Sequence, residues 1–289
     1  MNDNAPWPIK AYENLDFIKS REGRALRIMS EFLEPESRLS KFDIQDTIVF
    51  MGSARIPSEE QARKEMEQAT AADAIDRAAE RLKLSRYYED TRKLAFKMTE
   101  WSKSLKGNDR RFVVCTGGGP GIMEAANRGA SEAKGVNVGF NISLPMEQHE
   151  NPYITRQLCF EFHYFFMRKF WFAYLAKAIV VMPGGYGTLE ELFEILTLVQ
   201  TKVITKKMPI VLYGSDYWDE VFDLRALAKF GTIDAVDLDL MYRTDSVEDA
   251  FNYLTKELTE SVSYPGARRS FVDKNELPQD DKVQDPRSR

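Results

Sequence analysis

Cysteine and histidine are both scarce in this sequence, with two residues of each type among 289. Cys115 and Cys159 lie far apart, lack the spacing of metal ligands and sit in apolar runs, so we expect both to be reduced residues of the core. His149 and His163 have no spaced partner for a metal and belong to no recognisable serine–histidine–aspartate arrangement. The sequence therefore gives no support for a metal centre or a histidine-dependent hydrolase.

Positive charge is not in excess either. The formal net charge is −5 and the pI is about 5.4, so no global positive field attracts nucleic acid or anionic lipid. No apolar run approaches the roughly 20 residues of a membrane span, and the first residues lack the basic and apolar regions of a secretory signal. We expect a cytoplasmic protein without nucleic-acid or membrane partners, in which local groups bind any phosphate ligand.

Short β-type runs alternate with helical patterns along the chain, as in a parallel sheet covered by helices. Several runs are continuously apolar, which is typical of strands buried on both faces. Helical patterns occupy residues 59–84 and 88–105. The predicted fold class is α/β, a Rossmann-like doubly wound parallel sheet with an N-terminal helical appendage. The predicted strands span residues 47–51, 112–116, 136–142, 178–182, 209–213 and 240–244.

The composition divides the chain into three parts. Residues 1–40 carry a helical pattern and predict an N-terminal appendage packed on the core. Residues 41–265 hold all the predicted strands and form the Rossmann-like domain. Residues 266–289 are charged, contain two prolines and have few apolar residues, which predicts a disordered tail.

Three glycine-rich loops follow predicted strands, and in a doubly wound sheet such loops meet at the ligand crevice. Glycine lets an anion approach backbone N–H groups, and a helix that starts just afterwards points its positive end at that anion. Neither the P-loop nor the dinucleotide fingerprint fits the spacing. Turn formation alone is the alternative explanation, but three loops at strand ends favour a phosphate cradle. The loops contain Gly52 and Ser53; Gly117, Gly118, Gly119 and Gly121; and Gly184, Gly185, Gly187 and Thr188.

Glu191 has two explanations that the local pattern leaves open. Thr188 and Glu191 form a T-x-x-E capping box ahead of an apolar helical pattern, and a helix cap alone accounts for both residues. The same position also puts a carboxylate beside the proposed phosphate loop. There it can stabilise the oxocarbenium character that develops on ribose when an N-glycosidic bond breaks, or orient a water molecule.

Arg168 and Lys169 interrupt a dense aromatic stretch over residues 160–172. The planar guanidinium of arginine suits phosphate or ribose oxygens, although a structural ion pair at the rim of the core explains it equally well. Aromatic residues in such a stretch are more often core than base-stacking platforms. Met123 and Glu124, which follow the second loop, are further candidates for ligand contact, and Glu124 is also placed to cap a helix.

The run PGGYGTLEE at residues 183–191 matches the PGGxGTxxE signature of the LOG (Lonely Guy) family, whose plant members are cytokinin riboside 5′-monophosphate phosphoribohydrolases. Arg168-Lys169 resembles the arginine–lysine pair of that family, at the family's spacing. The loops at residues 117–123 and 52–54 resemble its other two strand-end loops. The resemblance covers roughly residues 47–258. The N-terminal appendage and a longer helical insertion between positions 58 and 101 look more like the larger bacterial branch, whose members have also been labelled lysine decarboxylases.

The resemblance implies a nucleotide-binding catalytic domain, usually a homodimer or higher homo-oligomer, with no metal or redox cofactor. It implies hydrolysis of AMP or N6-substituted AMP to a free base and ribose 5-phosphate, as in an AMP nucleosidase or in cytokinin biosynthesis. The family pattern assigns catalysis to Arg168 and Glu191 and phosphate binding to the second and third glycine loops. Gly52, Ser53, Met123, Glu124 and Lys169 are then further candidates for substrate contact.

Two other functional classes compete with hydrolysis. A carrier or binding module for a phosphate-bearing nucleotide or a molybdopterin-type cofactor would use the same loops, but it would not need Arg168 together with Glu191. A regulatory or DNA-processing protein would need a basic face, and the acidic charge balance argues against one.

Overall fold

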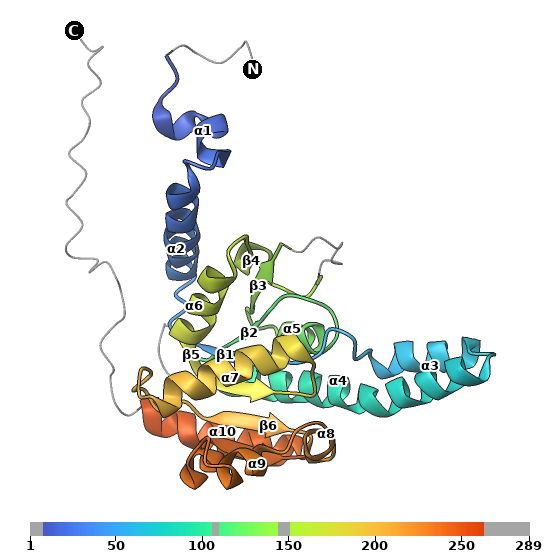
Figure 1. Ribbon diagram of the computed structural model, residues 1–289. Helices are drawn as coiled ribbons and strands as arrows, with labels where there is room; N and C mark the ends of the chain where they lie inside the picture. Colours follow the sequence, from blue (N-terminus) through green and yellow to red (C-terminus); the bar gives the residue numbers. More distant parts are fainter. Residues whose placement is uncertain (1–7, 106–109, 144–150, 263–289) are drawn as a thin grey trace.

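The computed structural model describes residues 8–105, 110–143 and 151–262. His149 and the predicted tail at residues 266–289 lie outside these ranges. The described chain contains one seven-stranded sheet in the order β4-β3-β2-β1-β5-β6-β7, and every neighbouring pair of strands is parallel (Figure 1). The predicted α/β class is confirmed. The strands are β1 (Thr47–Met51), β2 (Val113–Thr116), β3 (Val138–Ile142), β4 (Cys159–Phe162), β5 (Ala176–Val181), β6 (Ile210–Tyr213) and β7 (Met241–Thr244).

The strand order reverses between β1 and β5. From β1 the chain builds outward on one side through β2, β3 and β4, and it then returns to place β5 against the other side of β1. This pair of central strands is the topological switch point of a doubly wound sheet, where the ligand crevice of such folds lies beyond the carboxyl ends of the strands.

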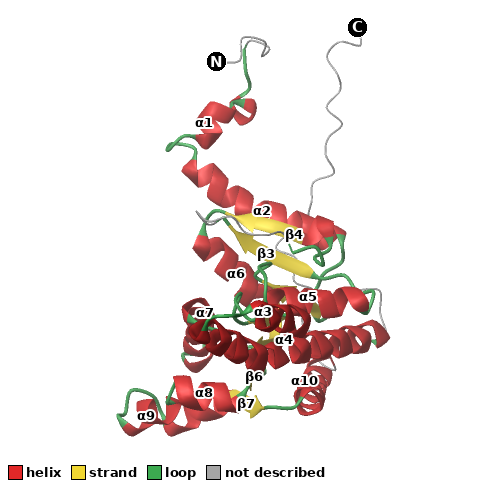
Figure 2. Cartoon of the chain, turned by 90° about the vertical axis from the view of Figure 1, so that its right-hand side faces the viewer, coloured by secondary structure: helices red, strands yellow, loops and turns green. Residues whose placement is uncertain are grey.

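Helices cover both faces of the sheet (Figure 2). The helices α4, α5 and α10 lie on one face, and α2, α6 and α7 lie on the other, while α3 packs on α4. The larger helices are α2 (Arg24–Lys41), α3 (Glu59–Gln68), α4 (Ala72–Ser104), α5 (Ile122–Glu132), α6 (Phe165–Leu175), α7 (Tyr186–Gln200) and α10 (Val247–Val262). The shorter ones are η1 (Ala11–Glu13), α1 (Leu15–Lys19), η2 (Arg156–Leu158), α8 (Ser215–Val221), α9 (Leu224–Lys229) and η3 (Ala235–Leu240).

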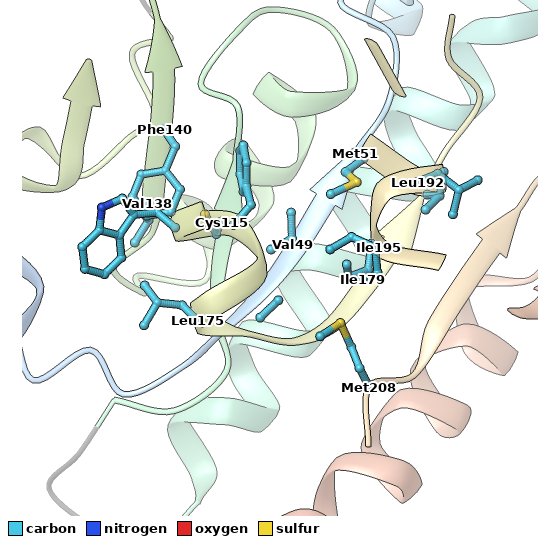
Figure 3. Packing of buried hydrophobic residues seen from close by; sticks show 14 of the residues in the cluster. Val49, Met51, Cys115, Val138, Phe140, Leu175, Ile179, Leu192, Ile195 and Met208 are labelled. Atoms are coloured by element: carbon cyan, nitrogen blue, oxygen red, sulfur yellow. The ribbon is translucent and has the colours of Figure 1, made fainter. Parts of the chain in front are cut away.

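Alternate residues of the central strands build two separate core layers. In β1, Val49 points to the layer shared with α6 and α7, whereas Ile48 points to the layer shared with α4, α5 and α10. In β5, Ile179 and Val180 divide in the same way. Figure 3 shows the first layer, where Ile195 of α7 lies near Ile179, Leu192 of α7 lies near Met51, and Val138 and Phe140 extend the layer at β3. Both faces of these strands are buried, so their sequences read as continuous apolar runs.

All six predicted strands are present, with ends within two residues of those expected. The strand β4 was missed because it lies inside the aromatic stretch, where no turn residues separate it from α6. As an edge strand it alternates exposed and buried residues, which also corrects the prediction for Cys159. Cys115 is buried as predicted, but Cys159 is exposed, since it occupies an outward position of this edge.

The N-terminal region is helical, as expected. In α2, Ile28, Phe32 and Leu39 recur at helical spacing and pack on the core, while Leu33 on the opposite side is about half exposed. Figure 1 shows α2 extending away from the sheet with α1 at its far end. Within the described residues, no helix combines the length and the apolar character needed to cross a membrane.

Candidate active site

Hydrogen bonds join the three glycine-rich loops to one another at the switch point. The backbone N–H of Ser53 in the first loop donates to the carbonyl of Pro183 in the third, with an N–O distance of 3.0 Å. The carbonyl of Ser53 accepts the N–H of Ile122, directly after the second loop, at 3.1 Å. Through its backbone, Ser53 therefore links the loops that follow β1, β2 and β5. The three loops converge, as predicted.

Two glycines of the second loop serve the packing of the loops. Gly121 has φ of +69°, and a Cβ there would lie 2.4 Å from the carbonyl oxygen of Ser53. Gly118 has φ of +74°, and a Cβ there would lie 2.1 Å from the amide oxygen of Asn141 at the end of β3. A left-handed conformation and such close approach both require glycine.

The second loop also reaches the guanidinium of Arg168. A Cβ at Gly117 would lie 3.5 Å from Nη2 of Arg168 and 2.9 Å from Sδ of Met123. A Cβ at Gly119 would lie 2.7 Å from Cε of Met123, so the methionine side chain lies along this loop. The thioether of methionine is flexible and can yield to a ligand.

The third loop leads into an exposed helix start. The N-cap of α7 is Gly185, which has no side chain that could accept a hydrogen bond. Leu189 is the first residue of the helix whose N–H donates a helical hydrogen bond, to the carbonyl of Gly185 at 3.0 Å. The N–H groups of Tyr186, Gly187 and Thr188 precede it and meet no acceptor among the described residues. A Cβ at Gly185 or Gly187 would meet no described atom within 4 Å, so the space before this helix is open.

The predicted capping box at Thr188 and Glu191 is wrong. The helix begins at Tyr186, three residues earlier than the pattern suggested, because a glycine can serve as N-cap there. Thr188 consequently lies in the first turn, is buried, and packs its hydroxyl against Gly184. Glu191 is left without a capping role.

Glu191 instead forms an ion pair with Arg168. Nη2 of Arg168 lies 2.5 Å from Oε1 of Glu191, and the two side chains are only 13% and 17% exposed. Arg168 lies in the first turns of α6 and Glu191 in the second turn of α7, so the pair links the two helices that start at the carboxyl edge of the sheet. The guanidinium carbon of Arg168 also lies 5.3 Å from the ring centroid of Phe172.

Burial dominates the electrostatics of this pair. It raises the pKa of the Glu191 carboxyl above the ordinary value, although the charge of Arg168 acts in the opposite direction, and the neighbouring Glu190 adds to the rise. Nε of Arg168 is buried and has no acceptor within the described part of the chain. An unsatisfied buried donor is unfavourable unless a ligand supplies the acceptor.

Lys169 and Glu124, two of the expected contacts, are engaged elsewhere. Nζ of Lys169 contacts the carboxylate of Glu190 and lies 3.4 Å from that of Glu194, and the bond to Glu190 raises the pKa of Lys169. Glu124 accepts a hydrogen bond of 2.7 Å from the phenol of Tyr88 on α4. Gly52 packs against the side chain of Ile122. These residues lie around the crevice, but neither Lys169 nor Glu124 is free to meet a ligand without exchanging a partner.

Two residues near the loops were not predicted. Asn141 fills the space beside Gly118 and bonds to the carbonyl of Phe160 on β4 at 3.0 Å. Tyr217 donates its hydroxyl to the carbonyl of Gly184 at 3.1 Å. A polar residue in the otherwise apolar strand β3 was a usable signal for Asn141, whereas nothing local to the sequence marks Tyr217.

The arrangement combines an uncapped helix start, which attracts an anion, with a buried carboxylate–guanidinium pair one turn away. Within the described chain no three His, Cys, Asp or Glu residues are grouped so that they could hold a metal ion. Fold and site together define a Rossmann-like α/β protein whose crevice lies at the switch point.

Part of the chain also matches the model of a known protein family. Residues 123–254 match the model of the family described as "Possible lysine decarboxylase", which is the LOG-family domain. The resemblance to the LOG family is therefore confirmed for this part of the chain, which contains Arg168, Glu191 and the third loop.

Two solved structures similar to this chain are molybdenum cofactor proteins. The carrier protein from Chlamydomonas reinhardtii is 19% identical, with a TM-score of 0.45 over 74% of this chain and 99% of that chain. The binding protein from the phototrophic bacterium Rippkaea orientalis is 16% identical, with a TM-score of 0.44 over 73% of this chain and 95% of that chain. The comparison with curated proteins gave no match.

Proposed function

We propose that this protein is a nucleotide 5′-monophosphate N-glycosidase that hydrolyses AMP or N6-substituted AMP to the free base and ribose 5-phosphate. The observation that carries the proposal is the buried Arg168–Glu191 pair beside the uncapped start of α7. The helix start suits a phosphate, and the pair suits a sugar on which positive charge develops.

In this reaction a water oxygen bonds to C1′ of the ribose as the bond from C1′ to the base nitrogen breaks. The electron pair of that bond leaves with the base, which also receives a proton, and the remaining hydroxyl stays on C1′. Glu191 in its ionised form stabilises the oxocarbenium character of the ribose or orients the water. The charge of Arg168 favours the ionised form of that carboxyl, and its Nε is available to a ribose or phosphate oxygen.

The phosphate-binding groups of the proposal are the backbone N–H groups of residues 186–188 with the second loop beside them. Because Gly185 and Gly187 leave the space in front of α7 open, an oxygen can approach those N–H groups closely. Met123 lies along the second loop and can shift to admit the base. No lysine cluster is needed, which fits the acidic charge balance.

The direct test is to incubate the purified protein with AMP and N6-substituted AMP and to follow the free base by chromatography. Adenosine is the substrate control, because without its phosphate we expect turnover to be nearly abolished. Glu191→Gln should lower kcat by about 10²–10⁴-fold. Glu220→Gln, an exposed acid on α8, is the matched variant and should leave kcat unchanged. Absence of turnover with both nucleotides in the wild-type protein would refute the proposal.

The carrier function remains the alternative, and it predicts tight retention of a ligand without hydrolysis. A carrier has no use for a buried carboxylate–guanidinium pair, which favours the enzyme. Mass spectrometry of ligand released from the purified protein separates the two. A stoichiometric phosphate-bearing compound together with no release of base would support the carrier.

A further inference from the structure

The helix that carries Arg168 is capped by a residue from the N-terminal region. Tyr164 is the N-cap of α6, and its own side chain makes no capping bond. The carboxylate of Glu31 on α2 takes that role, with Oε1 accepting the N–H of His163 at 2.8 Å and Oε2 accepting the N–H of Tyr164 at 3.2 Å. A carboxylate at a helix start accepts hydrogen bonds from backbone N–H groups that lack a partner in the helix. Its negative charge also interacts favourably with the positive end of the helix dipole.

Glu31 also binds α6 through its backbone. Pro35 lies inside α2 and has no N–H, so the carbonyl four residues before it, that of Glu31, has no partner within its own helix. That carbonyl accepts a hydrogen bond of 3.0 Å from the indole Nε1–H of Trp171 on α6. Beside it the ring of Phe32 packs on Phe170 and Trp171, at centroid distances of 5.5 and 5.9 Å. Two turns of α6 are thus fixed from one position of α2.

The link continues from Tyr164 to the ion pair. The carbonyl of Tyr164 accepts the N–H of Arg168 at 3.2 Å, and the guanidinium of Arg168 reaches Glu191 at 2.5 Å. The helix α6 starts next to the edge strand β4, and its first residues Phe165 and Phe166 are 52% and 54% exposed, so few contacts hold this turn in place. The contact from Glu31 is therefore a polar restraint on the start of α6 that does not depend on the ion pairs between α6 and α7.

We propose that Glu31 is a positioning residue, which fixes the first turn of α6 and thereby the guanidinium of Arg168 beside Glu191. Its effect on turnover rests on the proposed function, whereas its effect on the helix does not. The N-terminal appendage is on this account part of the active-site support. Since α7 and its phosphate-binding N–H groups do not contact Glu31, losing the cap should affect kcat far more than KM.

The test compares the full-length wild-type protein with Glu31→Ala and Glu31→Gln by hydrogen exchange and by AMP hydrolysis. In Glu31→Ala we expect the amides of residues 160–172 to exchange about 3- to 30-fold faster, the range for loss of one helix cap, with β1 and β5 unchanged. We expect kcat to fall about 10-fold and KM to stay within about 2-fold. Glu31→Gln keeps a hydrogen-bond acceptor but loses the charge. Its exchange rates and its kcat should therefore lie between those of the wild-type protein and Glu31→Ala.

The matched control is Glu34→Gln on the same helix, because Glu34 is 54% exposed and its ion pair within the described residues is with Arg38 on α2. It should leave both exchange and kcat unchanged. Unchanged exchange over residues 160–172 in Glu31→Ala would overturn the inference, as would faster exchange with an unchanged kcat. If the wild-type protein turns over no nucleotide, the proposed function fails, and the exchange result alone then decides whether Glu31 holds α6.

Discussion

At Glu191 two influences act on one carboxyl group. Burial raises its pKa, and the guanidinium of Arg168 opposes that rise without cancelling it. The folded protein therefore holds the proton more tightly than the unfolded chain does. The stability linked to this group is fully present below the ordinary pKa of glutamate and is lost as the pH rises through the raised pKa. A buried carboxyl that lowers stability at neutral pH is typical of a functional site.

The pH dependence of turnover follows from the same shift. Glu191 must be ionised in the proposed mechanism, so kcat/KM should fall as the pH decreases through its raised pKa, above the ordinary value of about 4.3. The charged groups that face it are Arg168 and Lys169 on α6 and Glu190 on α7. In Arg168→Gln the opposing charge is lost, so this acid limb should move to higher pH and the maximal rate should fall about 10²-fold.

Rate profiles of the wild-type protein and Arg168→Gln between pH 4 and 9 measure this prediction. An acid limb at or below the ordinary glutamate value, or one that does not move in the variant, would show that Glu191 is not the titrating group.

At the scale of elements, the glycines of the second and third loops have different tasks. Gly121 lies in a left-handed conformation against the carbonyl of Ser53, so it holds two loops together. Gly187 lies in the first turn of α7 and faces open space, so it matters only if a ligand occupies that space. A single sequence motif cannot distinguish these tasks, because both residues look like parts of a phosphate loop.

Substituting the two glycines separates the tasks. Gly121→Ala should lower the free energy of unfolding by about 1–3 kcal/mol, since the left-handed conformation and the contact with Ser53 both become unfavourable. Gly187→Ala should leave stability unchanged or raise it by up to about 1 kcal/mol, because alanine favours a helix. It should raise KM for AMP about 10-fold by keeping the phosphate from the backbone. Urea unfolding and steady-state kinetics measure both variants, and an unchanged KM in Gly187→Ala would contradict the proposed phosphate position.

At the scale of the whole molecule, an apolar groove of about 810 Å³ lies beside the candidate site. It is bounded by α6, α7 and the segment after α7, and Phe165, Phe166 and Val203 in it are 52%, 54% and 70% exposed. An exposed aromatic patch of this kind is typical of a protein interface. The resemblance to the LOG family implies a homodimer or higher homo-oligomer, and we predict that a second copy of this chain covers the groove.

Substituting a groove residue tests the assembly. Phe166→Asp should place a charge in the interface and dissociate the dimer, lowering its affinity by at least about 10²-fold. Phe230→Asp, at the C-cap of α9, is the matched control, since Phe230 is 77% exposed and lies outside the groove. Light scattering coupled to size-exclusion chromatography gives the mass of each variant. A monomeric wild-type protein, or a Phe166→Asp variant that stays dimeric, would contradict the inference.

The sequence by itself determined the sheet and the identity of the candidate loops. Continuous apolar runs such as β1 and β5 are local signals, because a strand buried on both faces needs apolar residues at every position. The strand ends, the glycine-rich loops and the helices that follow them could also be predicted, because their signals are local in the sequence. The family motif added Arg168 and Glu191 together, although they are 23 positions apart and no local rule joins them.

Only the tertiary structure decided what Glu191 pairs with and what holds α6. The capping box at Thr188 was a valid local pattern, but the helix starts at Tyr186 with Gly185 as its N-cap, and the carboxyl of Glu191 pairs with Arg168 on another helix. Glu31 caps a helix 132 positions away. Such partners are fixed by the packing of distant elements, which no periodicity along the chain records. The sequence thus determined which elements form, while their packing decided which side chains meet.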